Sequence, residues 1–364
     1  MKVAHHVYNY WSYSGATQQA IKLARIMSDG EAVKSTFINS EKNTLSFYKI
    51  QEDDGITVID LPSRLLFKIV SIFYLLVVSK YKFDIHHFHG FHLAEKLFVR
   101  IFKKTIVFKC TLEGSDDLKS LSSRKFSFLH KWIFRKVDVI NSLNNRIYNI
   151  NKDYIDKVKL VIIPNGVELP SAPMLEQRNI FLFAGAIVPR KQPLQVIRYY
   201  IEHYSKTGFP LILAGPCDSN LPEFNNAYYD ECKALAATLP DGAIQFVGNQ
   251  SKKDMARLYS ISLGLIFFSS REGTPNVVLE SMSYNCPIIH NERDEVTQWL
   301  LGDEIAKKLS VSDGIVKAAK VDELFKIIES KALIERGGTF SIEKTAALTL
   351  NLYNSLYEAR GKQC

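Results

Sequence analysis

Neither a Cys-x-x-Cys pair nor the residue pattern of a signal peptide is found in this sequence of 364 residues. Its five cysteines are an odd number and none falls in a Cys-x-x-Cys pair, so we expect free thiols in a reducing compartment and no structural metal. The first residues, MKVAHHVYNYWSYSG, lack a charged segment followed by an apolar run and do not predict a signal peptide. The most apolar stretch, 65–79, is interrupted by Lys68 and is too short to span a bilayer. These absences favour a cytoplasmic location.

The composition excludes several protein classes. Hydrophobic residues make up 46% of the chain and charged residues 23%, which is typical of globular proteins and excludes disorder, collagen-like repeats and small disulfide scaffolds. There is no simple internal repeat and no low-complexity segment. At roughly 100–200 residues per domain, the length predicts two domains.

Positive charge is concentrated in the first half of the chain. The net charge is +8, and residues 1–170 hold 25 basic and 16 acidic residues, whereas 171–364 hold 21 and 22. Residues 64–136 alone carry 15 basic and 5 acidic residues. Such a localised surplus predicts contact with an anionic partner, and a solvated Lys-rich surface is the plainer alternative.

Short β-rich runs alternate with helical patterns along the chain, and the runs of the second half are almost continuously apolar. Alternation predicts parallel sheets with crossover helices, and continuous apolar runs predict strands buried on both faces. We therefore predict an α/β fold with two doubly wound, Rossmann-like domains facing across a cleft. The runs lie at 2–8, 33–38, 55–61, 84–89, 105–110, 137–142 and 157–164, and then at 179–186, 210–216, 243–248, 263–270 and 286–290.

The expected domain boundaries follow from these two series. Residues 1–170 form the first domain and 171–340 the second, with the Pro-rich segment 164–177 as the linker. Residues 341–364 are expected to form a helix that packs back toward the first domain.

The clearest functional motif, REGTPNVVLE, follows the apolar run 263–270. Ligands of open α/β sheets bind beyond the carboxyl ends of strands, where this motif is expected. Gly273 and Pro275 suit a tight loop that opens a helix, whose N-terminus favours a phosphate. Glu272 would lie in the loop, and Glu280, farther into the helix, can accept hydrogen bonds from two vicinal sugar hydroxyls. A helix start with incidental acids is the alternative.

With this motif the sequence resembles glycosyltransferase family 4, retaining enzymes with the GT-B fold, of the type that builds bacterial surface polysaccharides. Segment 272–280 is similar to their Glu–seven residues–Glu signature. The resemblance extends through VIIPNGVE with Asn165 and Gly166, FLFAGAIVPRKQP, ILAGP and FVGNQSKKDMARLYS. It implies that Glu272 contacts the donor sugar near the reacting carbon and that Glu280 binds the ribose of the nucleotide. It also implies donor contacts for the loop residues Gly273, Thr274, Pro275, Asn276 and Val277.

The segment expected to clamp the diphosphate departs from the family pattern. Relatives have an Arg directly after the glycine of the first strand of this domain and a Lys five residues on. Here Ala186 stands at the Arg position and Lys191 at the Lys position, with Arg190 beside it. An Arg grips a phosphate with two hydrogen bonds, whereas a Lys acts as a point charge. The resemblance therefore implies a catalytic role for Lys191 and donor binding by Arg190 as a partial substitute; a surface charge at a helix start is the alternative for Lys191.

The first domain contains two candidates for contact with the donor. Gly15 precedes a helix expected at 17–27 and stands where the family has a glycine-rich loop, which implies donor binding. The run DIHHFHGFH resembles the family's strand that faces the donor sugar, which makes His89 a catalytic candidate. On a strand, His87 and His89 point to one face and His86 to the other. Because no cysteine or carboxylate cluster accompanies them, we predict no metal site, and a core role for His89 is the alternative.

Acceptor contacts are assigned to the segment TLEGSDD, which follows the run 105–110. Glu113 and Asp116 are the candidates, because their carboxylates can bind sugar hydroxyls. A helix cap by Ser115 or Asp116 explains the same residues equally well.

Together these inferences predict a retaining glycosyltransferase. It would move a sugar from a UDP- or GDP-sugar to a glycan or polyprenyl-diphosphate-linked acceptor in O-antigen, capsule or exopolysaccharide synthesis, without a metal or other cofactor. Lys191 and the helix start at Pro275 would stabilise the leaving diphosphate, and Glu272 would orient the sugar rather than act as a nucleophile. The rival hypotheses are a nucleotide-sugar epimerase of the same fold and a non-catalytic sugar-nucleotide-binding subunit.

Three basic, aromatic-rich stretches, 64–82, 95–104 and 124–136, suit an anionic membrane surface. They predict a peripheral position at the inner face of the cytoplasmic membrane; apolar residues that are simply core are the alternative. No nucleic-acid-binding motif is present, so we do not expect a nucleic-acid partner.

Overall fold

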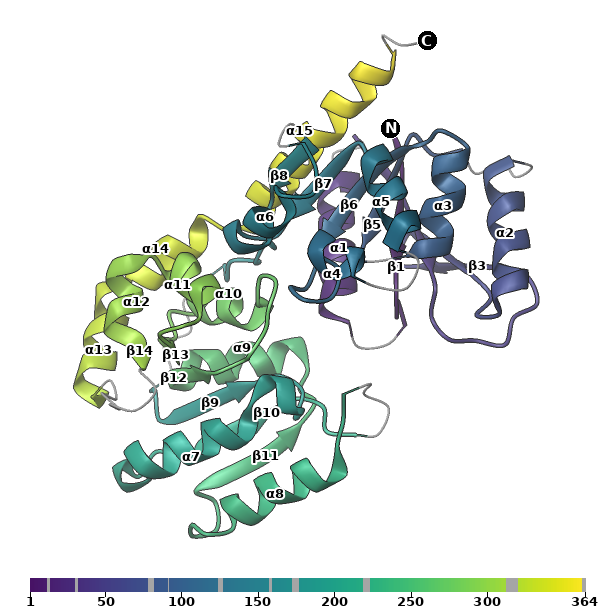
Figure 1. Ribbon diagram of the computed structural model, residues 1–364. Coiled ribbons are helices and arrows are strands. Elements are labelled where there is room, and N and C mark those ends of the chain that lie inside the picture. The colour runs from purple at the N-terminus through teal and green to yellow at the C-terminus, as the bar shows by residue number, and fades with distance from the viewer. Residues whose placement is uncertain are drawn as a thin grey trace. The chain divides into compact units, whose positions relative to one another are not determined.

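The computed structural model describes residues 1–11, 14–29, 32–77, 82–90, 92–123, 127–156, 159–171, 177–218, 223–311 and 320–361. The chain divides into two compact units (Figure 1). Unit 1 comprises Met1–Gly166 and Ile342–Cys364, and unit 2 comprises Val167–Ser341. Parts of the expected linker (172–176) and of the basic stretches (78–81 and 124–126) lie outside the described residues.

Unit 1 contains one sheet with the strand order β3-β4-β2-β1-β5-β6-β7-β8. All seven runs expected in the first half of the chain form strands, and these strands pair in parallel. The additional strand, β3, pairs antiparallel with β4 at the sheet edge and is largely exposed, so it has no apolar run to reveal it. The strands are β1 Lys2–Val7, β2 Lys34–Asn39, β3 Lys49–Asp53, β4 Ile56–Asp60, β5 Ile85–His89, β6 Thr105–Cys110, β7 Val139–Ser142 and β8 Leu160–Ile162.

Two groups of helices cover the two faces of this sheet. Val3 of β1 packs with Leu23 of α1 and Tyr353 of α15, whereas the next residue, Ala4, packs with Ile72 of α2. Successive strand residues point to opposite faces, so α1 and α15 cover one face and α2 the other. Helix α3 contacts both α2 and α5 and belongs to the α2 side. The helices are α1 Gly15–Asp29, α2 Leu65–Val77, α3 Leu93–Ile101, α4 Leu118–Ser122, α5 Ser127–Lys136, α6 Asn145–Asn151 and α15 Ile342–Gly361.

Unit 2 is built on an all-parallel sheet with the order β11-β10-β9-β12-β13-β14. Every residue of β9, β10 and β12 is buried, which confirms the prediction of strands covered on both faces for these three. The prediction is wrong for β11, which lies at the sheet edge and has no buried residue. The strands are β9 Ile180–Ala184, β10 Leu211–Ala214, β11 Ile244–Gly248, β12 Ser262–Phe267, β13 Ile288–Asn291 and β14 Ser310–Val311. The helices are α7 Pro193–His203, α8 Asn226–Ala236, α9 Lys252–Ile261, α10 Asn276–Ser283, α11 Glu295–Leu301, α12 Asp303–Leu309, α13 Val321–Ser330 and α14 Ala332–Gly338, with short 3-10 turns at Pro189–Lys191 and Ser205–Thr207.

In each sheet, the strands that follow the first one in sequence are added on one side of it, and later strands are added on its other side. In unit 1, β1 lies between β2 and β5, and in unit 2, β9 lies between β10 and β12. Such a reversal opens a crevice at the carboxyl ends of the two diverging strands, and ligands of doubly wound folds bind there. The topology therefore points to two places in the chain: the segments after β1 and β5, and the segments after β9 and β12.

Candidate functional site

The two strands at the reversal point of unit 2 bring Lys191 and Glu272 together. Lys191 ends the 3-10 turn after β9, and Glu272 lies in the loop after β12. Lys191 Nζ lies 2.5 Å from Glu272 Oε1, and the two side chains are only 17% and 13% exposed. The hydroxyl of Ser269 donates to the same oxygen at 2.5 Å. Two residues proposed from the sequence are thus joined in one small polar cluster, which we call the Lys–Glu cluster (Lys191, Ser269 and Glu272).

Arg190 borders the Lys–Glu cluster and ties its two loops together. Its Nη1 lies 3.5 Å from Glu272 Oε1, and its Nε donates to Glu223 Oε2 at 2.9 Å. Its backbone carbonyl accepts from Ser270 N at 3.0 Å and from Ser270 Oγ at 3.1 Å. The guanidinium is therefore held between two carboxylates.

The segments after β9 and β10 touch through their backbones. A Cβ atom on Gly215 would lie 1.9 Å from the carbonyl oxygen of Gly185, and Gly215 has a φ of +156° that favours glycine. Ala186, at the position where relatives have an Arg, is 9% exposed. Polypeptide backbone therefore occupies this edge of the sheet, and the nearest cationic side chains after β9 are those of Arg190 and Lys191.

Helix α10 begins directly after the Lys–Glu cluster. Pro275 is its N-cap, with φ −70° and ψ 115°, so it stands just outside the helix. The sequence had suggested that the helix itself starts at Pro275. Thr274 is 5% exposed, and Gly273 and Pro275 are also buried. Asn276 and Val277 form the first turn, where backbone N–H groups of an α-helix have no partner within the helix.

Glu280 lies on α10, five residues into the helix, and is partly buried. Its Oε2 accepts a hydrogen bond from the hydroxyl of Tyr259 at 3.0 Å. Tyr259 belongs to α9 and is 1% exposed. The tyrosine fixes one carboxylate oxygen and was not singled out from the sequence, because only the fold brings α9 beside α10.

The reversal point of unit 1 contains a cluster of buried histidines. In the parallel register of β1 and β5, His5 stands opposite His87. His89 Nε2 lies 3.1 Å from His5 Nδ1, and His87 Nδ1 lies 2.5 Å from the hydroxyl of Tyr353 on α15. One ring nitrogen from each of His5, His87 and His89 lies within 4.8 Å of the others. We call this set the three-histidine cluster.

Burial controls the charge of the three-histidine cluster. The rings of His5, His87 and His89 are 1%, 2% and 4% exposed. Loss of hydration lowers the pKa of His5 to about 3 and the pKa values of His87 and His89 well below the usual range. All three rings are therefore neutral at physiological pH.

The alternation expected for these histidines is confirmed. His86 points to the other face, where its Nδ1 lies 3.0 Å from His6 Nε2. The sequence analysis missed His5, because alternation within one run says nothing about the neighbouring strand.

The remaining candidates of unit 1 lie in the loops after β1 and β6. Gly15 is the first residue of α1, two residues earlier than expected. Behind it, the hydroxyl of Thr17 donates to the carbonyl of Tyr8 at 2.6 Å, which closes the loop after β1. Glu113 pairs with Arg146 at 2.9 Å, and its side chain is 21% exposed.

Asp116 is buried and satisfied within its own loop. It accepts from Thr111 N at 2.8 Å, from Leu112 N at 2.9 Å and from the hydroxyl of Thr111 at 2.6 Å, and burial raises its pKa. The helix cap suggested for Ser115 or Asp116 is supplied by Asp117 instead, which accepts from Ser120 N at 2.9 Å at the start of α4. Ser115, Asp116 and Asp117 are all residue types that cap helices, and the backbone conformation determines that Asp117 is the N-cap of α4.

Comparison with solved structures identifies the architecture. Sucrose-phosphate synthase from Thermosynechococcus elongatus superposes with a TM-score of 0.75 at 15% identity, covering 98% of this chain and 99% of that one. HepE of Anabaena, in complex with UDP-glucose, gives 0.72 at 12% identity over 98% and 100%. Trehalose-6-phosphate synthase from Burkholderia multivorans gives 0.69 at 12% identity over 99% of each. The chain has the GT-B fold.

A family model matches the half of the GT-B fold that holds the Lys–Glu cluster. Residues 169–328 match the glycosyl transferases group 1 model, which supports a glycosyltransferase. No curated protein sequence matches the chain. The matched region contains Lys191, Glu272 and Glu280 but none of the unit 1 candidates.

Proposed function

We propose that this protein is a retaining glycosyltransferase of the family 4 type, which transfers a sugar from a UDP- or GDP-sugar to a glycan or lipid-linked acceptor in bacterial surface polysaccharide synthesis. The observation that carries the proposal is the Lys–Glu cluster at the reversal point of unit 2, with a helix N-terminus directly behind it. A cation, a carboxylate and a helix start at one sheet edge can hold a sugar and its diphosphate together. Solved structures of the same fold support the donor class, since HepE holds UDP-glucose and pneumococcal GtfA holds UDP and GlcNAc.

Each candidate site residue of unit 2 is assigned one role in this proposal. Lys191 and the first turn of α10 stabilise the negative charge that develops on the leaving diphosphate, and Arg190 assists once it releases Glu223. Glu272 binds hydroxyls of the donor sugar, and Glu280 binds the ribose. The backbone of the loop that enters α10 contacts the donor; its residues are Gly273, Thr274, Pro275, Asn276 and Val277.

The reaction would retain the configuration of the sugar. The bond from the anomeric carbon to the diphosphate oxygen breaks, the acceptor oxygen bonds to the same face of that carbon, and the acceptor proton passes to the leaving phosphate. Glu272 is not assigned as a nucleophile, because Lys191 and Ser269 already hold its Oε1. Unit 1 is assigned Gly15 for the donor sugar and Glu113 for the acceptor, while Asp116 keeps the shape of the loop that carries Glu113. His89, which the sequence suggested for the donor sugar, is 4% exposed and its Nε2 lies 3.1 Å from His5 Nδ1, so we assign it to the core of unit 1.

A nucleotide screen tests the donor assignment. Excess UDP, GDP or the matching nucleotide sugar is expected to raise the melting temperature by several degrees, because a ligand at 100 times its Kd stabilises a protein by about 2.7 kcal/mol. Glu280→Gln should weaken the effective nucleotide about 10-fold, through loss of a charged acceptor. Glu304→Gln is the control, since Glu304 forms an exposed pair with Lys308 at 3.0 Å. No shift with any nucleotide would remove the donor proposal, and an unchanged Kd in Glu280→Gln would remove the ribose assignment.

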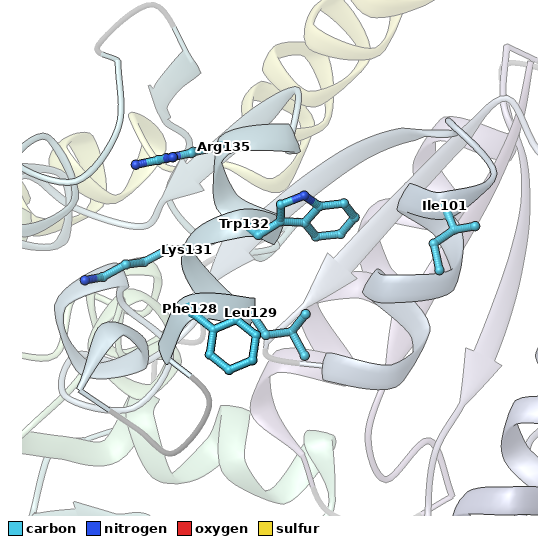
Figure 2. Close-up of a pocket in the computed structure, with 6 residues that line it drawn as sticks. All are labelled: Ile101, Phe128, Leu129, Lys131, Trp132 and Arg135. Carbon is cyan, nitrogen blue, oxygen red and sulfur yellow. The ribbon is translucent and has the colours of Figure 1, made fainter.

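We also propose that unit 1 binds the surface of an anionic membrane. Exposed apolar and basic side chains on its α2 face support this. Leu66 of α2 is 70% exposed and Phe128 of α5 is 71% exposed. Between α3 and α5 lies an open, apolar groove of about 610 Å³, in which Trp132 extends toward Ile101 (Figure 2). The groove is lined by Ile101, Phe128, Leu129, Lys131, Trp132 and Arg135.

Charge accompanies these apolar side chains. Lys131 and Arg135 extend to the other side of α5 from Trp132 (Figure 2) and are exposed. Apolar groups that enter the acyl boundary beside basic groups that meet headgroups are what a peripheral protein on an anionic bilayer needs. In the described part of the chain, no helix is long and apolar enough to cross a membrane.

Vesicle binding tests this surface. Wild-type protein is expected to bind phosphatidylglycerol vesicles better than phosphatidylcholine vesicles, with binding that falls as salt is added. Phe128→Glu should reduce partitioning about 10-fold, since a buried aromatic side chain contributes roughly 1.5–3 kcal/mol. Leu348→Glu is the matched control, because Leu348 is 49% exposed on α15, which covers the opposite sheet face. Equal and salt-independent weak binding to both vesicles would exclude the membrane surface.

A further inference from the structure

The three-histidine cluster has unused hydrogen-bonding capacity in the core of unit 1. His87 Nε2 and His89 Nδ1 are buried and have no hydrogen-bond partner among the described residues. A buried polar atom without a partner costs about 1–3 kcal/mol, so two of them in one cluster need an explanation. A bound ion that uses ring nitrogens would provide one.

We propose that His5, His87 and His89 bind a divalent transition-metal ion of the zinc type. This departs from the prediction of no metal site, which considered one histidine run and not His5 on the neighbouring strand. The proposal goes beyond glycosyl transfer and does not depend on it, since the site would be filled in the absence of any sugar nucleotide. Three imidazoles are a sufficient ligand set for zinc, with water in the fourth position. Imidazole donors without a carboxylate also disfavour magnesium and calcium, which prefer oxygen ligands.

The hydrogen bonds around the cluster select the nitrogen that each ring offers. His87 Nδ1 faces the hydroxyl of Tyr353 at 2.5 Å, and His5 Nε2 lies 3.3 Å from the hydroxyl of Ser35. A histidine that binds a metal through one nitrogen usually donates the other N–H to such an acceptor. This leaves His87 Nε2 and His5 Nδ1 for the ion. His89 can offer either ring nitrogen: Nδ1 has no hydrogen-bond partner among the described residues, and Nε2 lies 3.1 Å from His5 Nδ1.

The required movement is small. Zinc–nitrogen bonds of about 2.0–2.1 Å place the nitrogens of a tetrahedral site about 3.3 Å apart. One ring nitrogen from each of the three residues lies within 4.8 Å of the others, and His87 and His89 stack with ring centroids 4.2 Å apart. Rotation about χ2, which is a soft torsion in histidine, lets the rings converge.

Lys109 is the charged group that opposes a cation here. It contributes to the lowered pKa values of His5, His87 and His89, and its Nζ donates to Asn165 at 3.0 Å. Burial lowers the pKa of Lys109 itself to about 8.

The experiment uses full-length protein without a purification tag, stripped with a chelator and then titrated with Zn²⁺ or Co²⁺. We expect one tightly bound equivalent, an absorption spectrum typical of nitrogen-ligated tetrahedral Co²⁺, and a higher melting temperature with zinc. His89→Asn should weaken binding at least about 100-fold, since even outer partners of metal ligands are worth 10–100-fold. His86→Asn is the matched control on the same strand, because His86 faces away toward His6.

Several results would overturn the proposal. Stripped wild-type protein that takes up no tightly bound metal would do so, as would a Co²⁺ spectrum typical of an octahedral, water-rich ion. Equal metal affinity in wild type, His89→Asn and His86→Asn would place the ion elsewhere. If His89→Asn does not fold, the wild-type spectrum and stoichiometry decide alone. None of these readouts requires a sugar donor, so their failure leaves the glycosyltransferase proposal untouched.

Discussion

Glu272→Gln is expected to lower kcat/KM for sugar transfer by about 1000-fold, the upper range for removal of one preorganised polar group from an active site. The amide keeps the size of the side chain but removes the negative charge that pairs with Lys191 at 2.5 Å. Without that charge, the ammonium loses its fixed position and the donor sugar loses a charged acceptor. The measurement is initial-rate kinetics with the nucleotide sugar found by the thermal screen.

Glu304→Gln is the control for Glu272→Gln. It removes the same charge from a Glu–Lys pair whose side chains are 86% and 58% exposed, where an ion pair contributes about 0–1 kcal/mol. It should transfer sugar at the wild-type rate. Full activity in Glu272→Gln would exclude the proposed role of the Lys–Glu cluster. Formation of an epimer by wild-type protein without acceptor would replace the transferase proposal with epimerase chemistry.

Lys191→Met is expected to reduce kcat by about 100-fold or more, with a smaller change in KM. The methionine keeps most of the apolar side chain but removes the charge that is assigned to the leaving diphosphate. An interaction made mainly in the transition state affects kcat more than substrate binding. The 17% exposure of Lys191 strengthens the effect, because a partly desolvated charge is poorly screened by water.

Two further variants separate charge from position in the Lys–Glu cluster. Lys308→Met removes the exposed partner of Glu304 and should leave kcat unchanged. The double variant Lys191→Met/Glu272→Gln should be much less impaired than the product of the two single effects, because residues that act as one unit are not additive. Strict multiplication of the two effects would show that Lys191 and Glu272 work independently.

The fold was largely predictable because its signal is local. Apolar runs such as 180–184 and 263–267 carry enough β-forming residues to be found one at a time, and their alternation with helices implies the parallel sheets. The exposed edge strand Lys49–Asp53 was missed because it has no apolar run of its own. It is a strand through its pairing with β4, which the sequence does not reveal.

The candidate site was predictable only where the resemblance supplied a motif. Glu272 and Lys191 were both proposed, but their contact depends on the adjacency of β9 and β12, which no run of residues encodes by itself. Ser269, Tyr259 and His5 were also missed. The roles of Tyr259 and His5 depend on partners that are distant in sequence, and Ser269 depends on the path of the loop after β12. Serine, tyrosine and histidine are each too common to mark a site by themselves.

Unit 1 is assembled from both ends of the chain, and this has a consequence for the order of biosynthesis. Unit 2 is one continuous segment, whereas Val3, Leu23 and Ile85 of unit 1 share a core with Ile342 and Tyr353 of the last helix. On the ribosome, the first 166 residues emerge early, but the part of the apolar sheet face that α15 covers stays exposed while all of unit 2 is made. The nascent chain therefore exposes this apolar surface while residues 167–341 are synthesised, until α15 has been made and can cover it.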